Sequence, residues 1–431
     1  MTADLFAADF RPDCYWWDRT PRAAAGSGVL PAKADVVVIG SGYTGLHAAL
    51  QTARAGRATV VIDAEDLGFG CSTRNGGQVS TSVKPGFDAL ARRHGPERAF
   101  RIIREGQNSL AFLKDFIVAE GIDCDLVRRG RFHAAHSAAE YEALAQTFAN
   151  QPKGLETEAH MVARSAQRAE IGSDFYHGGV VQPQHVSVDP ARYHQSLLDR
   201  VRQAGATLVG RCPATAIEKT ATGFTVTTPK GRIAARDVLV ATNGYTGPLT
   251  PWLRRRVIPI GSYIIATEEL PEATVERLFP SGRHITDSRK VVYYYRASPD
   301  RRRILFGGRV SLSETDPRAS GPKLLADMVR IFPDLAGTRI ARSWMGFVAY
   351  SFDELAHVGR HEGLWYAMGY CGSGVGMASY LGMRIGQQIV GLKEGATAFD
   401  GLGFQTRPFY TGNPWFLAPS ILYYRWRDRR S

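Results

Sequence analysis

The sequence predicts an α/β fold with two sheets, and three observations lead to this prediction. Residues 35–63 read as a buried strand, a glycine loop, an alanine-rich helix and a second strand. Residues 364–391 repeat the order of strand, glycine loop and helix. Between the two units, residues 206–308 contain several short alternating strands, as a second sheet would. At 431 residues the chain is longer than one core supports, so we expect two intertwined domains.

The loop of the first unit, GSGYTG, has the pattern GxGxxG. Gly40 allows a tight turn, Gly42 lets backbone amides approach a pyrophosphate, and Gly45 lets the next helix pack closely on the strand. Tyr43 and Thr44 stand in the first turn of that helix, whose N-terminus would face the phosphates with its partial positive charge. The order of the elements is that of a Rossmann-type nucleotide-binding unit.

Asp63, followed by Ala64, ends the second strand 18 residues after the last glycine of the loop. A carboxylate at this place can accept hydrogen bonds from both ribose hydroxyls of an adenine nucleotide. The same charge disfavours a 2′-phosphate and so argues against NADP. The unit alone leaves FAD and NAD as alternatives.

A polar, glycine-rich loop, GFGCSTRNGGQ, follows at residues 68–78. It is too polar for a core and too rich in glycine for a helix, and its composition suits close backbone contact with a ligand. The residues that we expect to contact the cofactor are Cys71, Ser72, Arg74, Asn75, Gly76, Gly77 and Gln78.

The remaining elements alternate along the chain. An aromatic-rich arm over residues 1–33 is expected to pack on the body of the protein. Helical spacing predicts helices at 87–120, 138–150 and 189–204. Strands are predicted at 131–135, 207–210, 214–219, 223–228, 232–235, 238–241, 261–267, 291–296, 304–308 and 364–368.

The composition is that of an ordinary globular protein, with 44% hydrophobic and 22% charged residues. The five cysteines are scattered without a CxxC pair and the 11 histidines lack metal-binding spacing, so we expect a reducing cytoplasm and no metal. The N-terminus does not resemble a secretory signal, and no apolar run reaches the length of about 18 residues that spans a bilayer. The net charge of +12 is spread over turns such as 254–256 and 301–303, so we expect no nucleic-acid partner.

Two glycine units at opposite ends of the chain suit a flavoprotein. The first can hold the ADP half of FAD, and the second can point a helix N-terminus at the flavin ring. Reduction places negative charge on that ring, and a helix dipole with backbone amides stabilises it. The residues expected at the second unit are Gly372, Ser373, Gly374, Val375 and Gly376.

Six motifs in order carry a resemblance to a known family: GFGCSTRNGGQ, ATNGYTGPL, PIGSYIIATEEL, YYYRASPDRRRILFGGR, WMGFVAYSFDELAHVGR and GYCGSGVGMASYLGMRIGQQIVG. On these motifs the chain resembles the D-amino-acid-oxidase superfamily of FAD enzymes, and within it the gamma-glutamylputrescine oxidase group. The resemblance extends over nearly the whole chain from about Tyr15.

The resemblance implies a glutathione-reductase-type Rossmann domain for FAD, with a sheet-based substrate domain that covers the flavin face. The FAD domain would comprise 34–88, 151–250 and 338–400, the substrate domain 89–150 and 251–337, and the tail 401–431. Further FAD contacts are expected at Ala214, Thr242, Asn243, Gly244 and Gly346. Some relatives carry a covalent cysteine near the position of Gly346, so we expect noncovalent FAD here.

The resemblance also implies an enzyme that transfers hydride from a carbon next to an amine to flavin N5, giving an imine that hydrolyses. Relatives that oxidise sarcosine place cations at positions that here are Gly376 and Thr81, and a lysine near flavin N5 in some oxidases corresponds to Leu305. A small α-amino acid would lack partners for its carboxylate. We therefore expect an acylated diamine such as gamma-glutamylputrescine, with O2 or a quinone or other carrier as electron acceptor.

Five residues are candidates for the substrate side of the site. Arg309 can hold the acyl or carboxylate end of a longer substrate, or form a structural ion pair. Tyr263, Tyr293 and Tyr295 can be aromatic walls or packing residues, and strand alternation puts the last two on one face. Trp344 can line the pocket or fill the core between domains.

Two other functions remain open. One is a D-amino-acid or N-substituted amino-acid dehydrogenase that passes electrons to quinone, and the other is a non-catalytic FAD-binding protein. Residues 414–427 combine aromatic side chains with arginines, as interfacial segments do. Weak peripheral contact of this tail with a membrane therefore stands beside packing of the tail on the protein.

Overall fold

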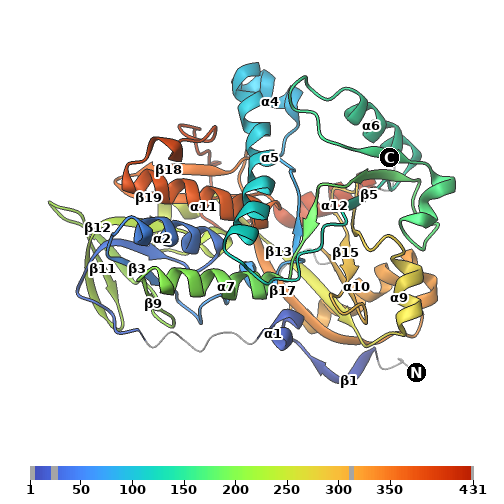
Figure 1. Ribbon diagram of the computed structural model, residues 1–431, viewed down its shortest axis with the longest axis horizontal. Coiled ribbons are helices and arrows are strands. Elements are labelled where there is room, and N and C mark those ends of the chain that lie inside the picture. The colour runs from blue at the N-terminus through green and yellow to red at the C-terminus, as the bar shows by residue number, and fades with distance from the viewer. Residues whose placement is uncertain (1–4, 21–27, 310–314, 429–431) are drawn as a thin grey trace.

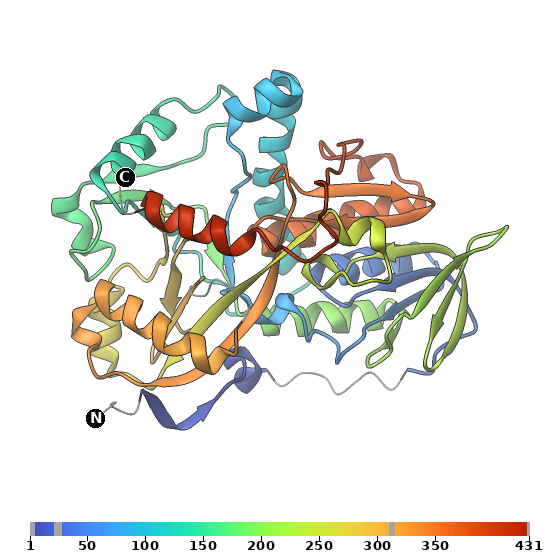
Figure 2. The same cartoon turned by 180° about the vertical axis from the view of Figure 1, so that it is seen from behind.

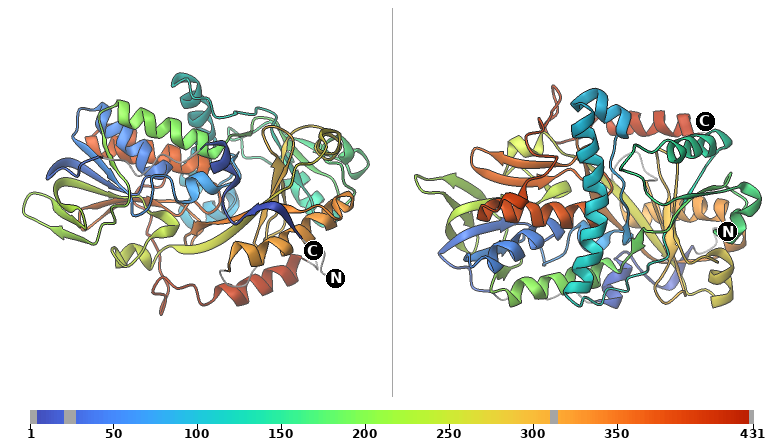
Figure 3. Two further views of the ribbon diagram at one scale, coloured as in Figure 1. Left: turned by 90° about the horizontal axis from the view of Figure 1, so that it is seen from below. Right: turned by 45° about the horizontal axis from the view of Figure 1, so that its top comes forward.

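The computed structural model describes residues 5–20, 28–309 and 315–428. Figure 1 shows two halves, each built on one sheet, with helix α5 (Pro96–Ala119) running along their junction. The same long helix crosses the middle of the molecule in the right-hand view of Figure 3. The prediction of an α/β fold with two sheets is confirmed.

The first sheet has eight strands and a parallel centre. Strand β2 pairs in parallel with β3 and with β12, and β12 pairs in parallel with β19. Its strands are β2 (Lys33–Ile39), β3 (Thr59–Ile62), β9 (Thr207–Val209), β10 (Ala216–Lys219), β11 (Phe224–Thr228), β12 (Gly231–Val240), β18 (His357–His361) and β19 (Leu364–Met368). The two strands predicted at 232–235 and 238–241 are one continuous strand, β12, because its first half pairs with β11 and its second half with β19.

Helices α2 (Tyr43–Arg54), α7 (Pro190–Gln203) and α11 (Gly374–Val390) belong to the same half as this sheet. Helix α11 lies directly against α2, and two of its glycines explain the close approach. A Cβ at Gly382 would stand 2.5 Å from the Thr44 carbonyl oxygen, and one at Gly386 would stand 2.8 Å from that of Ala48. The two glycine units predicted from the sequence are therefore neighbours in space.

The second sheet has nine strands in the order β1-β17-β13-β16-β15-β14-β5-β7-β6. Its strands are β1 (Phe6–Arg11), β5 (Arg131–Ala134), β6 (His160–Val162), β7 (Gly179–Gln182), β13 (Ile258–Thr267), β14 (His284–Asp287), β15 (Tyr294–Ala297), β16 (Ile304–Gly308) and β17 (Ile340–Tyr350). Helices α9 (Glu272–Leu278) and α10 (Pro317–Ile331) pack on one face and form a hydrophobic core with it. The opposite face is the one directed toward the cofactor loop described below.

Shorter elements complete the described chain. The helices are α1 (Tyr15–Arg19), α3 (Cys71–Arg74), α4 (Phe87–His94), α6 (Ala138–Ala149), α8 (Pro251–Arg254) and α12 (Leu417–Asp428), with 3-10 turns η1 (Arg164–Ala169), η2 (Asn243–Tyr245), η3 (Pro333–Leu335) and η4 (Lys393–Gly395). The strands β4 (Gln78–Val79) and β8 (Val186–Ser187) pair with each other. Figure 2 shows α12 on the half of the molecule that holds the nine-stranded sheet.

The domain ranges expected from the sequence differ from the observed sheet membership. Strands β6, β7 and β17 lie in the nine-stranded sheet, although their residues fall in ranges assigned to the FAD domain. Strand β1 of the expected arm also belongs to that sheet, and α5 packs into the core of the half that holds the eight-stranded sheet. Sheet membership depends on partners far away in the chain, which local alternation does not specify.

Candidate cofactor and active site

The first glycine loop has a shape that only glycine permits at two positions. Gly40 has φ +108°, and a Cβ there would stand 2.9 Å from the Ala241 carbonyl oxygen. A Cβ at Gly45 would stand 2.0 Å from the Gly40 carbonyl oxygen. The loop therefore brings the amino end of the 12-residue helix α2 against the carboxyl end of β2, the arrangement that accepts a pyrophosphate.

Asp63 lies beside this loop at the carboxyl end of β3. Its Oδ2 accepts hydrogen bonds from the backbone amide (2.8 Å) and hydroxyl (2.6 Å) of Ser41, and its Oδ1 accepts one from the amide of Glu65 at 3.1 Å. The Asp63 carbonyl accepts the amide of Cys212 at 2.7 Å, which brings the segment leading to Ala214 next to Ala64. The carboxylate is half-buried at the carboxyl end of β3.

The polar loop after β3 forms helix α3 and a tight turn held by Asn75. The Asn75 side chain donates to the carbonyls of Cys71 and Ser72 and accepts the amide of Gly77 at 2.8 Å. Gly77 has φ +70°, and a Cβ there would stand 2.0 Å from the Val188 carbonyl oxygen. The turn is therefore tied to the segment before α7.

Several contacts join this cofactor loop (residues 68–78) to the other sheet and to helix α2. The Ser72 hydroxyl accepts the amide of Tyr43 at 3.0 Å, and the Gln78 amide donates to the carbonyl of Tyr295 at 3.3 Å. A Cβ at Gly76 would stand 3.2 Å from the ring of Tyr294. The loop thus lies between the glycine loop and the nine-stranded sheet.

Tryptophans from distant parts of the chain form hydrogen bonds with the backbone of the cofactor loop. The indole of the fully buried Trp16 donates to the Asn75 carbonyl, and that of Trp344 donates to the Arg74 carbonyl, each at 2.8 Å. The Arg74 guanidinium lies 4.7 Å from the Trp17 ring centroid and donates to the Met345 carbonyl at 3.1 Å. Trp344 is 2% exposed, which favours the core interpretation of this residue over a pocket wall.

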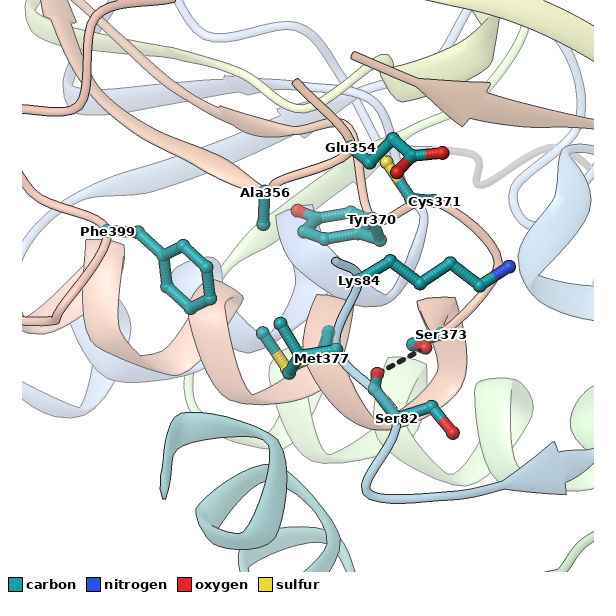
Figure 4. A pocket seen from close by; sticks show the side chains of 10 residues that line it. Ser82, Lys84, Glu354, Ala356, Tyr370, Cys371, Ser373, Met377 and Phe399 are labelled. Carbon is teal, nitrogen blue, oxygen red and sulfur yellow. Dashed lines mark hydrogen bonds between the residues drawn. The ribbon is translucent and has the colours of Figure 1, made fainter. Parts of the chain in front are cut away.

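The second glycine unit meets both of these loops. Tyr370 shares a 2.6 Å hydrogen bond with the hydroxyl of Thr44 on α2, and Asn243 of η2 accepts the amide of Gly369 at 2.9 Å. The Ser373 hydroxyl donates to the Ser82 carbonyl at 2.6 Å, as Figure 4 shows. The amino end of the 17-residue helix α11 is in this way fixed beside the chain that leaves the cofactor loop.

Tight packing surrounds three further glycines of the expected site. A Cβ at Gly244, which follows Thr242 and Asn243, would stand 2.9 Å from the Phe347 Cβ, and one at Gly346 would stand 3.3 Å from the Cys71 sulfur. A Cβ at Gly376 would stand 3.3 Å from the Ser109 hydroxyl. At each of these positions, a side chain larger than that of glycine would fit only if a neighbouring side chain moved.

The three positions at which the sequence lacks the expected cation have three different environments. Gly376, within α11 next to Val375, faces α5, so that a long side chain there would meet Ser109. The Thr81 amide and hydroxyl lie 3.3 and 3.2 Å from Nε2 of the buried His185. Leu305, at the third position, is 2% exposed and packs with Trp344.

The interpretation of Tyr263 and Tyr295 as aromatic walls is corrected by their position. Both are fully buried in the core formed with α9 and α10, on the face away from the cofactor loop. The Tyr295 hydroxyl donates to that of Tyr176 at 2.9 Å, and Tyr263 accepts the amide of Thr315 at 2.8 Å. Tyr293 packs against the same core, so the packing alternative holds for all three.

The face toward the cofactor loop carries a different set of polar residues. Tyr294 shares a 2.7 Å hydrogen bond with Ser262, and His133 shares one of 2.9 Å with Thr286. Arg131 lies two residues before His133 on β5 and so points to the same face. These residues were not expected at the site from the sequence, although the alternation Arg-Phe-His-Ala at residues 131–134 indicates a strand with one polar face.

Arg309 follows the end of β16. Its guanidinium donates to the Gly261 carbonyl at 2.6 Å, and its own carbonyl accepts from Arg425 of α12 at 3.2 Å. One interpretation of Arg309 was a structural ion pair. The structure shows, in addition, a hydrogen bond from its side chain to the backbone of β13.

Figure 4 shows a pocket beside the second glycine unit, with Lys84, Glu354, Cys371 and Ser373 among its lining residues. Cys371 is 4% exposed, has φ +50° and donates its thiol to the Gly369 carbonyl at 3.1 Å. Burial raises the pKa of Cys371 to about 11, so its thiol stays protonated near neutral pH. This environment agrees with the expectation of a small packing residue.

The described residues contain neither a metal-binding cluster nor a membrane-spanning helix. Residues 5–20, 28–309 and 315–428 hold no group of three or more His, Cys, Asp or Glu side chains that could bind a metal ion. Within the same ranges no helix is long and apolar enough to cross a membrane. His357, which stacks on Phe404 and bonds to Asp353 at 3.0 Å, is a core residue, and Asp353 orders its loop by accepting the amide of Leu355.

The C-terminal helix α12 packs on the protein by one side. Ile421 is buried, and the Asp428 carboxylate accepts the amides of Lys290 and Val291 at 3.1 Å each. Tyr423 and Trp426 are about half exposed on its outer side. Packing on the protein therefore accounts for part of the aromatic tail.

Comparisons with known proteins agree with this geometry. A family model described as FAD dependent oxidoreductase matches residues 35–388. Gamma-glutamylputrescine oxidoreductase of Escherichia coli is 30% identical over 92% of this chain and 93% of its own length, and the probable oxidoreductase OrdL of Rhizobium meliloti is 31% identical over 97% and 98%.

Solved structures show the same fold at lower identity. Glycine oxidase from Geobacillus kaustophilus superposes with a TM-score of 0.73 at 17% identity, covering 88% of this chain and 99% of its own. L-Proline dehydrogenase from P. horikoshii gives a TM-score of 0.70 at 18% identity, with coverage of 91% and 99%.

Proposed function

Because the chain belongs to the DAO family of FAD dependent oxidoreductases, with FAD as cofactor and amines or amino acids as the substrate class, we propose that it oxidises an amine that has no carboxylate on the reacting carbon. A gamma-glutamylputrescine-like acylated diamine is the favoured substrate. We further propose a cytoplasmic enzyme with a role in polyamine catabolism, with O2 or a quinone-type carrier as acceptor.

The residues of the two glycine units and of the cofactor loop are suited to bind FAD. The amino end of α2 and Asp63 would hold the ADP half, while the cofactor loop and the amino end of α11 would border the flavin. Bound FAD supplies a two-electron acceptor for hydride. The protein's part is to orient the amine, exclude water and keep the nitrogen neutral. Burial lowers the pKa of His133 far below its usual value, so its imidazole adds no proton there at neutral pH.

The observation that carries the substrate proposal is the packing at Gly376 and Thr81. A desolvated carboxylate requires cationic or donor partners close by. Gly376 packs against Ser109, and Thr81 is engaged with His185. An α-carboxylate at the flavin would therefore lose its hydration without gaining a charged partner at either position.

The test is anaerobic stopped-flow reduction of the flavin. We expect gamma-glutamylputrescine and related acylated diamines to bleach the flavin at least about tenfold faster than sarcosine, glycine or D-alanine at matched concentration, since one unmatched charged contact is worth about 1.5 to 3 kcal/mol. Faster bleaching by an amino acid than by every amine would favour the dehydrogenase alternative. Absence of bleaching by all compounds would favour a non-catalytic FAD-binding protein.

A second expectation concerns how FAD is held. Gly346 offers no side chain for attachment, and burial raises the pKa of the nearby Cys71 to about 11, which keeps its thiol in the unreactive protonated form. We therefore expect acid precipitation of the purified protein to release all of the flavin into the supernatant. Flavin that stays in the protein pellet would contradict noncovalent binding, and a Cys71→Ser variant would then identify the bond.

A further inference from the structure

A row of side-chain positions leads across the sheet away from the cofactor loop. Gly307, Tyr294, Thr286 and His133 are register partners on the four successive strands β16, β15, β14 and β5, so they share one face. Gly76 of the cofactor loop lies against Tyr294. Two strand spacings, or about 10 Å, separate Tyr294 from His133. The row therefore connects the cofactor loop to the start of β5.

Arg131 stands beside the far end of this row, two residues before His133 on β5. It points to the same face as His133, is partly buried, and donates from Nε to the side-chain oxygen of Gln182 at 3.1 Å. Among residues 5–20, 28–309 and 315–428, no carboxylate lies within ion-pair distance of it. Burial lowers the pKa of Arg131 to about 10, so the group remains charged at neutral pH. A partly desolvated cation with a neutral amide as partner is costly unless an anion joins it.

Lys84 is a second positive group whose charge acts on His133. Figure 4 shows its side chain reaching past the turn of Cys371 and Ser373. Its charge, like that of Arg131, contributes to the lowered pKa of His133, behind the larger effect of burial. The charge interaction with Tyr350, followed by those with Cys371 and Glu354, raises the pKa of Lys84. Burial and these two positive charges therefore keep the imidazole of His133 neutral near neutral pH.

We propose that Arg131 binds a carboxylate at the far end of the amine substrate. This inference rests on the proposed function and deepens it by naming the group that is recognised. An N-acylated four-carbon diamine that ends in a carboxylate spans about nine bonds from the reacting carbon to the carboxylate, the length of three extended residues or about 10 Å. That length is close to the distance of about 10 Å from Tyr294 to His133, the neighbour of Arg131 on the same face of β5.

This arrangement separates two kinds of anionic substrate. A carboxylate on the reacting carbon would lie near the flavin, too far from Arg131 for a hydrogen bond. A carboxylate at the end of an extended acyl group would reach it and form charge-assisted bonds with a guanidinium that presents several donors. The site can therefore reject small amino acids and still select an anion.

The experiment uses the FAD-loaded protein and the variant Arg131→Met. Substrates are putrescine carrying a glutaryl group, which ends in a carboxylate, and the same compound ending in a carboxamide. The apparent Kd from anaerobic flavin reduction should rise about 10- to 100-fold for the carboxylate in the variant and change less than about twofold for the carboxamide. The matched control is Arg129→Met, an exposed arginine two residues earlier, which should leave both values unchanged.

The variant Arg309→Met tests the alternative that Arg309, and not Arg131, binds the carboxylate. If this variant, and not Arg131→Met, removes the preference for the carboxylate, the proposal is overturned. Equal losses for carboxylate and carboxamide in Arg131→Met would overturn it as well, since they would indicate a structural role. Should Arg131→Met fail to fold, the variant Arg131→Lys is measured instead, together with the preference of the wild type for the carboxylate over the carboxamide. A wild-type preference below about twofold would contradict the proposal.

A titration with glutarate distinguishes this inference from the proposed function. Glutarate has no amine to oxidise, and its binding can be followed by the change in flavin absorbance. Weaker glutarate binding in Arg131→Met, together with no reduction by any acylated amine, would leave the anion site standing while the proposed reaction fails. Glutarate binding that is the same in wild type and variant would count against Arg131 itself.

Discussion

Replacing Gly45 with alanine should abolish stable FAD binding. The new Cβ would stand 2.0 Å from the Gly40 carbonyl oxygen, a backbone atom that cannot rotate away, so α2 would have to move off β2. Overpacking costs up to about 3 kcal/mol where side chains can adjust, and a backbone contact should reach at least that value, more than about 100-fold in affinity. The measurement is the FAD content after gel filtration and the Kd for FAD added to apoprotein.

The matched control is Gly86→Ala. Gly86 also stands at a helix start, the N-cap of α4, but a Cβ there would meet no atom within 4 Å and its φ of −67° suits any residue. This variant should retain FAD and thermal stability. Normal FAD content in Gly45→Ala would mean that the loop is not the pyrophosphate site.

Replacing Asp63 with alanine should weaken FAD binding at least tenfold. The change removes the acceptor for the ribose hydroxyls, and each hydrogen bond to a charged group contributes about 1.5 to 3 kcal/mol. It also removes two bonds from Ser41 and one from Glu65, so the glycine loop loses part of its order. The Kd for FAD should be measured by fluorescence quenching with apoprotein.

Asp35→Ala is the control for that variant. Asp35 lies near the other end of the same unit, where its carboxylate accepts the amide of Ala58 at 2.9 Å. We expect a modest loss of stability from this change, with an unaltered Kd for FAD. A Kd for FAD that is the same in Asp63→Ala as in wild type would show that the adenine ribose lies elsewhere.

Local features account for what the sequence predicted well. The first glycine unit follows from steric rules within 30 residues, and strands such as 364–368 match the observed bounds of β19. The aromatic arm was expected to pack on the protein, and Trp16 is fully buried. In each case the residues that decide the structure are near neighbours in the chain.

What the sequence did not specify is which face of a strand meets which partner. Alternation put Tyr293 and Tyr295 on one face, but only the position of α10 makes that face the core side and leaves Tyr294 at the cofactor loop. Arg131 and Lys84 were missed for the same reason. Each belongs to a short segment of ordinary composition, and the place of Arg131 in the sheet depends on the pairing of β5 with β14 over more than 100 residues.

The arm has a consequence for the order in which the molecule can be completed. Trp16 holds the carbonyl of Asn75, while β1 just before it pairs with β17 around Ile340. The earliest described residues thus depend on a strand that leaves the ribosome about three hundred residues later. The hydrogen bond from Trp344 of β17 to the Arg74 carbonyl can form only after β17 has been made. An FAD molecule that meets the nascent chain therefore finds the cofactor loop without its full support. Tight retention of the cofactor is in this sense a property of the finished chain.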